Sequence, residues 1–301
     1  MEFGKTNIEQ LSNIDFTLPT EQVGNYKILG GQPVVTPQVY VGCPRWGTKE
    51  WLGHFYPEHL KEKDFLYYYA KIFNCIELNT TYYRIPLAAQ VQHWKSQVSH
   101  DFKFCPKFPQ SITHVSKLQY CDEEVADFVR SLSYFEDTLG PVFLMPHPQM
   151  GPAFLPVIKR FIERLPSELN VFLELRQPDW FNNGLNSQLY DFLTDYKIGL
   201  VITDAAGRRD CVHMHLSKKE TFIRFVGNDL HTTDYSRIQD WTKRIRLWVQ
   251  QGLESVYFFM HQHKEINAPL LNRYVVEQLN SIPNIHLNTP QIIRSQATLF
   301  D

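Results

Sequence analysis

Charged side chains stand near the carboxyl ends of several predicted strands, and their types suit proton transfer on a bound anion. The candidate catalytic residues are Glu77, Lys107, Glu174 and Asp204. A carboxylate can move a proton during a reaction, and a lysine can hold an anionic group in place. Because a parallel barrel brings its strand ends together at one mouth, we expect these side chains in one cavity.

Other polar residues near the same strand ends could hold a substrate. The candidate substrate-binding residues are Arg45, Trp46, Asn79, Tyr83, His114, Arg176, Arg224, His261 and His263. Basic residues near the expected mouth outnumber acidic ones: Arg45, Arg84, Lys107, Arg176, Arg208, Arg209 and Arg224 against Glu77, Glu174, Asp204 and Asp210. Guanidinium groups pair well with carboxylate and phosphate oxygens, so this excess favours a small anionic ligand.

Several of these residues also have a purely structural explanation. Glu174 and Arg176 share a strand face and could form an ion pair that fills the barrel. Asp204 precedes a short Ala-Ala-Gly sequence and could organise that turn. Glu77 could hydrogen-bond a neighbouring strand, and Lys107 could extend to solvent. The sequence leaves both explanations open.

Two His-x-His pairs are candidates for metal binding, His213 with His215 and His261 with His263. Each pair would share one strand face, but a metal site needs a third ligand and an ordered surrounding. We therefore assign no metal ligand, although the second pair is better placed, at the expected mouth. The chain also lacks dinucleotide-binding, Walker, nucleophile-elbow and His-Glu-x-x-His motifs, so the sequence identifies no cofactor.

Apolar strands that alternate with helical patterns must position these residues. The predicted strands are 39–42, 75–79, 101–107, 140–145, 170–176, 198–204, 222–226 and 255–263, and the predicted helices are 60–73, 86–98, 122–135, 154–165, 185–196, 235–251 and 268–279. Ile76 and Leu78 alternate with Glu77 and Asn79, so one face packs on helices while the polar pair points inward. This order predicts an α/β fold, a single (β/α)8 TIM-like barrel.

The chain divides into an extension and one barrel domain. Residues 1–38 carry glycines and prolines between short apolar pieces, and we expect this N-terminal extension to pack on the barrel. Residues 39–301 form the TIM-like barrel domain. Within it, residues 205–220 after the sixth strand show no helical period, so an irregular connection is expected there.

Composition limits the classes of partner. With 301 residues and 43% hydrophobic content, the chain can bury a large core, and its net charge of −2 gives no general attraction to nucleic acid. Five cysteines without a Cys-x-x-Cys pair are typical of reduced thiols. We find no signal-peptide pattern and no membrane-spanning apolar run, and expect a cytoplasmic protein. The sequence does not indicate an oligomeric state.

A series of motifs in order along the chain gives a family resemblance. The matching residues are Gly42, Trp46, Trp51, Gly53, Phe55, Tyr56, Pro57, Phe73, Asn74, Glu77, Asn79, Tyr83, Pro86, Phe102, Phe104, Lys107, Ile112, Thr113, His114, Glu174, Arg176, Trp180, Arg224 and Gly227. Over residues 39–280 the chain resembles the domain-of-unknown-function-72 family of bacterial and archaeal TIM-barrel proteins. The resemblance implies the fold and no particular substrate. One difference is His261-Gln262-His263, where the family often has asparagines.

Three hypotheses of function follow. The first is a lyase, isomerase or hydrolase that uses acid–base chemistry on a phosphorylated or carboxylated metabolite. In it, arginines and Lys107 hold the anion while Glu77 or Glu174 moves a proton. The second is a metal-dependent phosphoesterase or nuclease-like hydrolase, by analogy with metal-bearing barrels. The third is a non-catalytic protein that binds a small ligand.

Overall fold

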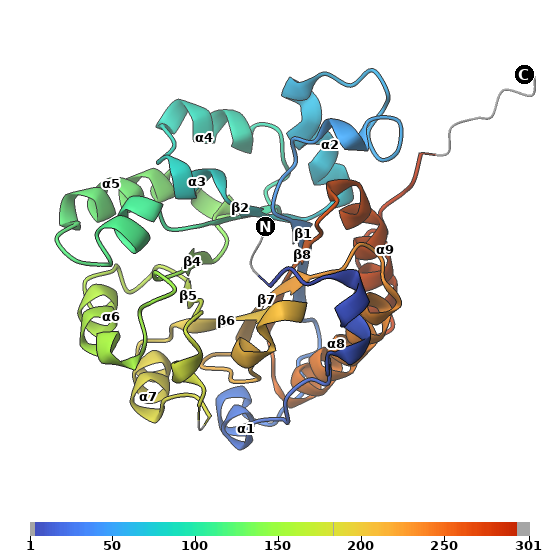
Figure 1. The fold of residues 1–301 in the computed structure, drawn as a ribbon. Coiled ribbons are helices and arrows are strands. Elements are labelled where there is room, and N and C mark those ends of the chain that lie inside the picture. Colours follow the sequence, from blue (N-terminus) through green and yellow to red (C-terminus); the bar gives the residue numbers. More distant parts are fainter. Residues whose placement is uncertain (1–3, 183, 294–301) are drawn as a thin grey trace, which may run out of the picture.

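Eight parallel strands form a nearly closed barrel in a computed structural model, which describes residues 4–182 and 184–293 (Figure 1). The strands are β1 (Gln38–Cys43), β2 (Cys75–Leu78), β3 (Lys103–Pro106), β4 (Val142–Leu144), β5 (Val171–Leu173), β6 (Gly199–Asp204), β7 (Glu220–Val226) and β8 (Ser255–His261). Their order is β3-β2-β1-β8-β7-β6-β5-β4. Between β3 and β4, the Phe108 N–H donates to the Phe143 carbonyl at 3.1 Å. The predicted TIM-like barrel is confirmed.

Helices surround the barrel (Figure 1). They are α1 (Val23–Leu29), α2 (Phe65–Ile72), α3 (Thr80–Tyr83), α4 (Ala88–Lys95), α5 (Asp122–Ser133), α6 (Leu155–Ile162), α7 (Ser187–Asp195), α8 (Thr232–Gln251) and α9 (Ala268–Leu279). The predicted helices all match one of these, because their apolar residues recur at helical spacing and face the strands. No helix in the described part of the chain is both long and apolar enough to cross a membrane.

Strand alternation sorts side chains into a barrel interior and an outer layer. Eight residues form a buried cluster inside the barrel: Cys75, Cys105, Phe143, Phe172, Val201, Phe222, Tyr257 and Phe259. Near the amino ends of the strands, the rings of Tyr40 and Tyr257 stack at 4.7 Å. Phe172 lies in this apolar interior, and two residues later Glu174 points the same way at the carboxyl end. The interior therefore changes from apolar to charged along the barrel axis.

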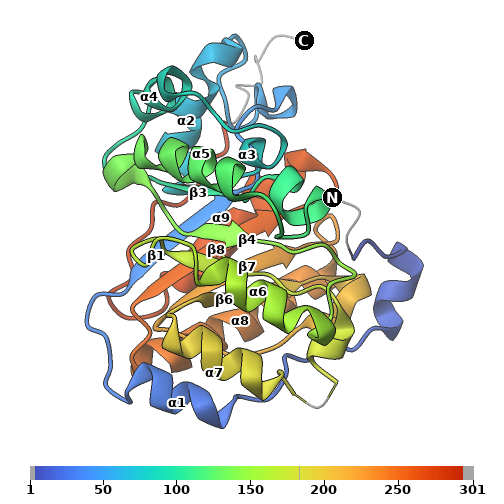
Figure 2. The same cartoon turned by 90° about the vertical axis from the view of Figure 1, so that its left-hand side faces the viewer.

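The connection after β6 lacks a regular helix, as predicted. It contains only a 3-10 helix, Ala206–Cys211, before an extended segment that leads to β7. In Figure 1, α1 lies in the ring of helices between α7 and α8, and Figure 2 shows it beside α7. The Asn25 side chain in α1 donates to the Met214 carbonyl at 2.6 Å and accepts from the Leu216 N–H at 2.9 Å. A helix from the N-terminal segment thus satisfies the backbone of this connection.

Candidate functional site

A buried ion-pair network fills the carboxyl end of the barrel, with Arg224 of β7 at its centre. The Arg224 Nε and Nη2 atoms each donate to Glu77 at 2.9 Å. Its Nη1 atom donates to both oxygens of Glu174, at 2.9 and 3.1 Å. The three side chains come from β2, β7 and the end of β5, and all are almost fully buried. One guanidinium therefore joins two carboxylates from distant parts of the sequence.

Glu77 has two further partners. The Nε2 atom of His261 lies 2.9 Å from its Oε2 atom, and the Asn79 amide donates to its Oε1 atom at 2.9 Å. His261 ends β8, and Asn79 follows β2. Both residues were predicted to bind substrate, and the structure brings both into contact with the network.

Glu174 also has two partners besides Arg224. The Thr203 hydroxyl of β6 donates to its Oε1 atom at 2.8 Å, and the Arg176 Nε atom donates to the same oxygen at 3.0 Å. Arg176 stands two residues after Glu174 on the same side of the chain, as the alternation predicts. The structure thus brings Glu77, Glu174 and the two arginines together, and their catalytic and substrate-binding roles stay predictions.

These contacts fix the charge of both carboxylates. Burial acts to raise their pKa values, but nearby cations outweigh it. Arg224 holds the pKa of Glu77 well below its ordinary value, and Arg176 with Arg224 lowers the pKa of Glu174 to about 2. Burial lowers the pKa of His261, so this imidazole is neutral at pH 7. The network therefore contains two carboxylates that stay ionised.

Lys107 lies beside this network and has a different environment. Its ammonium is 4.2 Å from the centre of the Tyr82 ring and 5.4 Å from the centre of the Phe143 ring. Only 6% of the residue is exposed, and among the described residues no hydrogen bond or ion pair joins its Nζ atom. Burial, followed by the charge of Arg224, lowers the pKa of Lys107 to about 7. Lys107 is therefore a buried amine that titrates near neutrality.

His114 stands near Lys107 without joining the ion-pair network. It lies in a π-helical turn, Ser111–Val115, and its Nδ1 atom is 2.8 Å from the Thr113 hydroxyl. Its ring meets the ring of Tyr82 at 5.5 Å and that of His147 at 5.4 Å. Burial and the neighbouring His147 lower its pKa to about 4, so His114 is neutral at pH 7.

Asp204 does not join the other predicted catalytic residues, and that expectation is wrong. Its carboxylate accepts from Trp241 Nε1 at 2.8 Å and pairs with Arg237 at 2.9 Å, both on α8. It also pairs with Arg209. Thr203 points into the barrel toward Glu174, so the next residue on the strand must point outward. Asp204 therefore links β6 to α8 through a hydrogen bond and an ion pair.

Arg45, Trp46 and Tyr83 form a separate pocket, in contrast to the single cavity that we predicted. This pocket encloses about 650 Å³ and is lined by Pro44, Arg45, Trp46, Gly47, Ile76, Leu78, Asn79, Thr80, Tyr83, Arg84 and Gln90. Asn79 connects the pocket to Glu77, whereas Thr81 and Tyr82 of α3 face Lys107 instead. The short helix α3 therefore separates the pocket from the lysine.

The basic excess predicted for the mouth is largely neutralised by ion pairs. Arg45 pairs with Glu265 at 3.3 Å, and Arg208 pairs with Asp210 at 2.9 Å. Arg209 is engaged by Asp204. The cations that remain beside the two ionised carboxylates of the network are Lys107, Arg176 and Arg224. Arg84, in the separate pocket, donates to the neutral side chain of Gln90 at 3.4 Å and also keeps its charge.

Histidines of the two His-x-His pairs have separate neighbours. β8 ends at His261, and His263 lies beyond it, where burial lowers its pKa and Asp229 is a neighbouring charge. His213 stacks on Phe181 at 5.2 Å, and its Nε2 atom lies 3.2 Å from the Val201 carbonyl. Within residues 4–182 and 184–293, no group of three or more His, Cys, Asp or Glu side chains is arranged to hold a metal ion.

Three contacts of the site were missed in the sequence. Tyr82 and Phe143 supply the rings beside Lys107, and Thr203 supplies the hydroxyl that bonds Glu174. Thr203 could not have been found, because β6 is apolar on both faces and its alternation gives no inward direction. Tyr82 could not either, because the sequence of the loop after β2 does not show which tyrosine points to Lys107.

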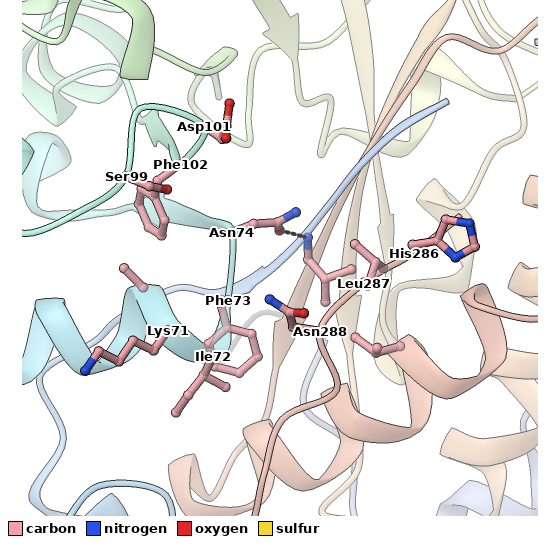
Figure 3. A pocket seen from close by; sticks show the side chains of 13 residues that line it. Lys71, Ile72, Phe73, Asn74, Ser99, Asp101, Phe102, His286, Leu287 and Asn288 are labelled. Atoms are coloured by element: carbon pink, nitrogen blue, oxygen red, sulfur yellow. Dashed lines mark hydrogen bonds between the residues drawn. The ribbon is translucent and has the colours of Figure 1, made fainter. Parts of the chain in front are cut away.

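A second pocket lies at the opposite, amino end of the barrel (Figure 3). It encloses about 250 Å³ and is lined by residues that include Asn74, Asp101 and His286. The Asn74 amide donates to the Val39 carbonyl and accepts from the Val41 N–H, both at 2.8 Å. None of the predicted site residues lines this pocket. Its polar groups serve the pairing of strand ends, a stabilising role typical of the amino face of such barrels.

Comparison with known proteins places the chain in a family. Residues 40–294 match the family model described as "Protein of unknown function DUF72". The UPF0759 protein YecE of Escherichia coli K12 is 32% identical over 282 residues, which cover 87% of this chain and 100% of that protein. Crystal structures of DUF72 family proteins are also similar. One from Thermotoga maritima has a TM-score of 0.63 at 22% identity and covers 81% of this chain and 98% of its own. One from Enterococcus faecalis has a TM-score of 0.63 at 18% identity and covers 84% and 98%. The chain therefore belongs to the DUF72 family.

Proposed function

We propose that this chain is an enzyme that moves a proton on a small carboxylated or phosphorylated substrate, with Lys107 as the group that carries the proton. The observation that carries the proposal is the environment of the Lys107 amine. The residue is buried against two aromatic rings, two guanidinium charges act on it, and no hydrogen bond joins its amine within the described residues. A general acid or base works best when its pKa lies near the working pH, and burial brings the pKa of Lys107 to about 7.

The two glutamates have a different role from the one predicted for them in the sequence analysis. A carboxylate with a pKa of about 2, such as Glu174, is a weak base at pH 7. Glu77 is held by Arg224, and its pKa is also lowered. The two glutamates instead hold Arg224 in place through its buried hydrogen bonds. They position the cation that, after burial, lowers the pKa of Lys107 most, although their own charges act to raise that pKa.

Local charge supports an anionic substrate. Lys107, Arg176 and Arg224 carry three positive charges when Lys107 is protonated, and Glu77 with Glu174 carries two negative ones. A substrate with one negative charge would neutralise the remainder. Charges so close together in a partly dry site interact strongly, so the protonated lysine favours an anion beside it.

Hydrogen–deuterium exchange into small molecules tests the proposal directly. The protein is incubated in D2O with carboxylated and phosphorylated aldehydes and ketones, and loss of C–H signals is followed by proton NMR. We expect exchange in at least one anionic compound, on the order of a hundredfold slower in Lys107→Met, the range that removal of a general base gives. Lys27→Met, on the exposed face of α1, is the matched control and should exchange like the wild type.

The same experiment separates the competing hypotheses. Exchange that is unchanged in Lys107→Met would contradict the role of the lysine. Anion binding without exchange in any compound would favour the non-catalytic binding protein. Arg176→Lys keeps the charge but removes the planar guanidinium, so it should weaken binding of the exchanging compound more than Lys27→Met does.

A further inference from the structure

The Thr81 side chain holds the backbone of Lys107 at the carboxyl end of β3. The Thr81 hydroxyl accepts from the Lys107 N–H at 2.9 Å and donates to the Lys107 carbonyl at 2.8 Å. Beyond this clamp the side chain lies over the ring of Tyr82 and beside the ring of Phe143. Only 6% of the residue is exposed. It is presented at the carboxyl end of β3, where barrels place reactive groups.

The arrangement suits a nucleophile as well as a base. We infer that Lys107 forms a Schiff base with a small anionic aldehyde or ketone, an inference that rests on the proposed function of the same site. A desolvated lysine beside other cations is a recurrent way to obtain a nucleophilic amine. The charges of Glu77 on β2, of Glu174 and Arg176 just after β5, and of Arg224 on β7 act on Lys107. The charge of Lys107 acts in turn on His114, in the turn after β3.

The chemical step balances without another reactant. The lone pair of neutral Lys107 Nζ attacks the carbonyl carbon, and the carbonyl π electrons move to oxygen. One proton passes from nitrogen to oxygen to give a carbinolamine. The C–O bond then breaks, the second nitrogen proton leaves with the oxygen as water, and a C=N double bond forms. Amine and carbonyl thus give imine and water.

The charge of the site favours this product. When the imine is protonated, its nitrogen regains the positive charge of the ammonium, now one bond from the substrate. That charge is close enough to attract a carboxylate or phosphate on the same substrate. It also withdraws electrons from the neighbouring carbon, which makes loss of a proton there easier. Because Lys107 is then bonded to the substrate, this proton leaves to solvent water. The imine is therefore a second route to the same exchange, distinct from proton transfer by the free amine.

Selectivity for Lys107 over other lysines gives a quantitative expectation. With a pKa of about 7, roughly half of Lys107 is neutral at pH 7. A lysine with an ordinary pKa near 10.4 is neutral in only about one molecule in 2,500. The amount of reactive amine thus differs on the order of a thousandfold. Lys27, exposed on α1, serves as the internal reference.

Borohydride trapping tests the inference on the wild-type protein. Glyoxylate, pyruvate or glycolaldehyde phosphate is added at pH 7, and sodium borohydride reduces any imine to a stable secondary amine. Peptide mass spectrometry then locates the adduct. We expect Lys107 to be modified at least a hundredfold faster than Lys27, with the neutral analogue glycolaldehyde much less effective. Modification of other sites should be unchanged in Lys107→Arg, which keeps a charge at the position.

The outcomes test the Schiff base separately from the proposed proton-transfer function. Modification of Lys107 at the rate of Lys27 overturns the Schiff base, and the proton-transfer function stands if deuterium exchange still depends on Lys107. Equal trapping of charged and neutral carbonyl compounds overturns the anionic substrate class. If the wild-type protein shows neither trapping at Lys107 nor deuterium exchange, both proposals are wrong. Because the site is mapped on the wild-type chain, a variant that fails to fold does not affect the result.

Discussion

Two buried cations in the barrel mouth differ in how they are neutralised. Arg224 makes hydrogen bonds to both Glu77 and Glu174, whereas no hydrogen bond or ion pair in the described chain joins the Lys107 amine. Removing a buried charge that has partners leaves those partners uncompensated. Removing a buried charge that lacks them relieves a desolvation cost instead. The two residues should therefore respond to mutation in opposite directions.

Arg224→Met should lower the free energy of unfolding by about 3–5 kcal/mol, because it leaves two buried carboxylates without their cation. Urea denaturation at pH 7 measures the change. The triple variant with Glu77→Gln and Glu174→Gln as well should recover part of the loss, since no buried charge then remains unpaired at this point. A single variant as stable as the wild type would show that Arg224 does not hold the network together.

Lys107→Met should stabilise the protein most at low pH. The folded pKa of Lys107, about 7, lies below its unfolded value, so the unfolded chain binds more protons between pH 7 and about 10.4. The free energy of unfolding of the wild type therefore rises with pH across that window. Below pH 7, the buried ammonium destabilises the folded protein to its full extent. The variant should gain up to about 5 kcal/mol below pH 7, and this gain should fade toward pH 10. Denaturation at pH 6 and pH 9.5 compares the two; an advantage that is equal at both would contradict the account.

At the scale of the elements, strand alternation decides which polar residues meet in the mouth. Thr203 and Asp204 are neighbours on β6, yet one bonds Glu174 inside the barrel and the other bonds Trp241 and Arg237 outside it. A shift of one residue along a strand exchanges the two faces. The chemical type of Asp204 therefore says less about its role than its position does.

Substitutions at these two neighbours should separate the inner and outer networks. Asp204→Asn should lower the free energy of unfolding by about 3 kcal/mol, because Arg237 loses a charged partner in a buried position. Thr203→Val removes one hydrogen bond to Glu174 and should cost about 1 kcal/mol. Thermal or urea denaturation of both variants measures the difference. A larger loss in Thr203→Val would contradict the assignment of Asp204 to the outer layer.

The strands and helices were largely predictable from the sequence. The side-chain directions that were not predictable have a physical cause. Apolar residues alternate along β2 and β5, so the inward direction of Glu77 and Glu174 follows from the period of a strand. Asp204 was misplaced because β6 is apolar on both faces and its alternation gives no inward direction. Arg45 and Tyr83 lie on loops after β1 and β2, and no period of the chain orients a loop residue.

At the scale of the whole molecule, the N-terminal extension supplies a helix at a place where the ring of helices around the barrel lacks one. Residues 205–220 carry no regular helix, and α1 lies between α7 and α8 instead (Figure 1). Glu21 accepts from Trp248 Nε1 at 2.9 Å and pairs with Arg244 at 3.1 Å on α8. We therefore propose that the extension folds as one unit with the barrel.

Asn25→Ala tests the coupling of the extension to the barrel. The substitution leaves the Met214 carbonyl and the Leu216 N–H without their partner in a buried place, so we expect a loss of about 2–3 kcal/mol in the free energy of unfolding. Lys27→Ala, two residues along the same helix but exposed, should change it by less than about 0.5 kcal/mol. Two separate unfolding transitions in the wild type would show instead that the extension is independent of the barrel.

The central claim is that the barrel mouth holds an amine of near-neutral pKa that responds to an anion. NMR titration of lysine side chains labelled with carbon-13, with Lys107 assigned by its absence in Lys107→Met, measures this most directly. The account predicts that Lys107 titrates near pH 7 and that millimolar phosphate raises its pKa, less so at high salt. A midpoint near pH 10, or one that phosphate does not move, would contradict the account.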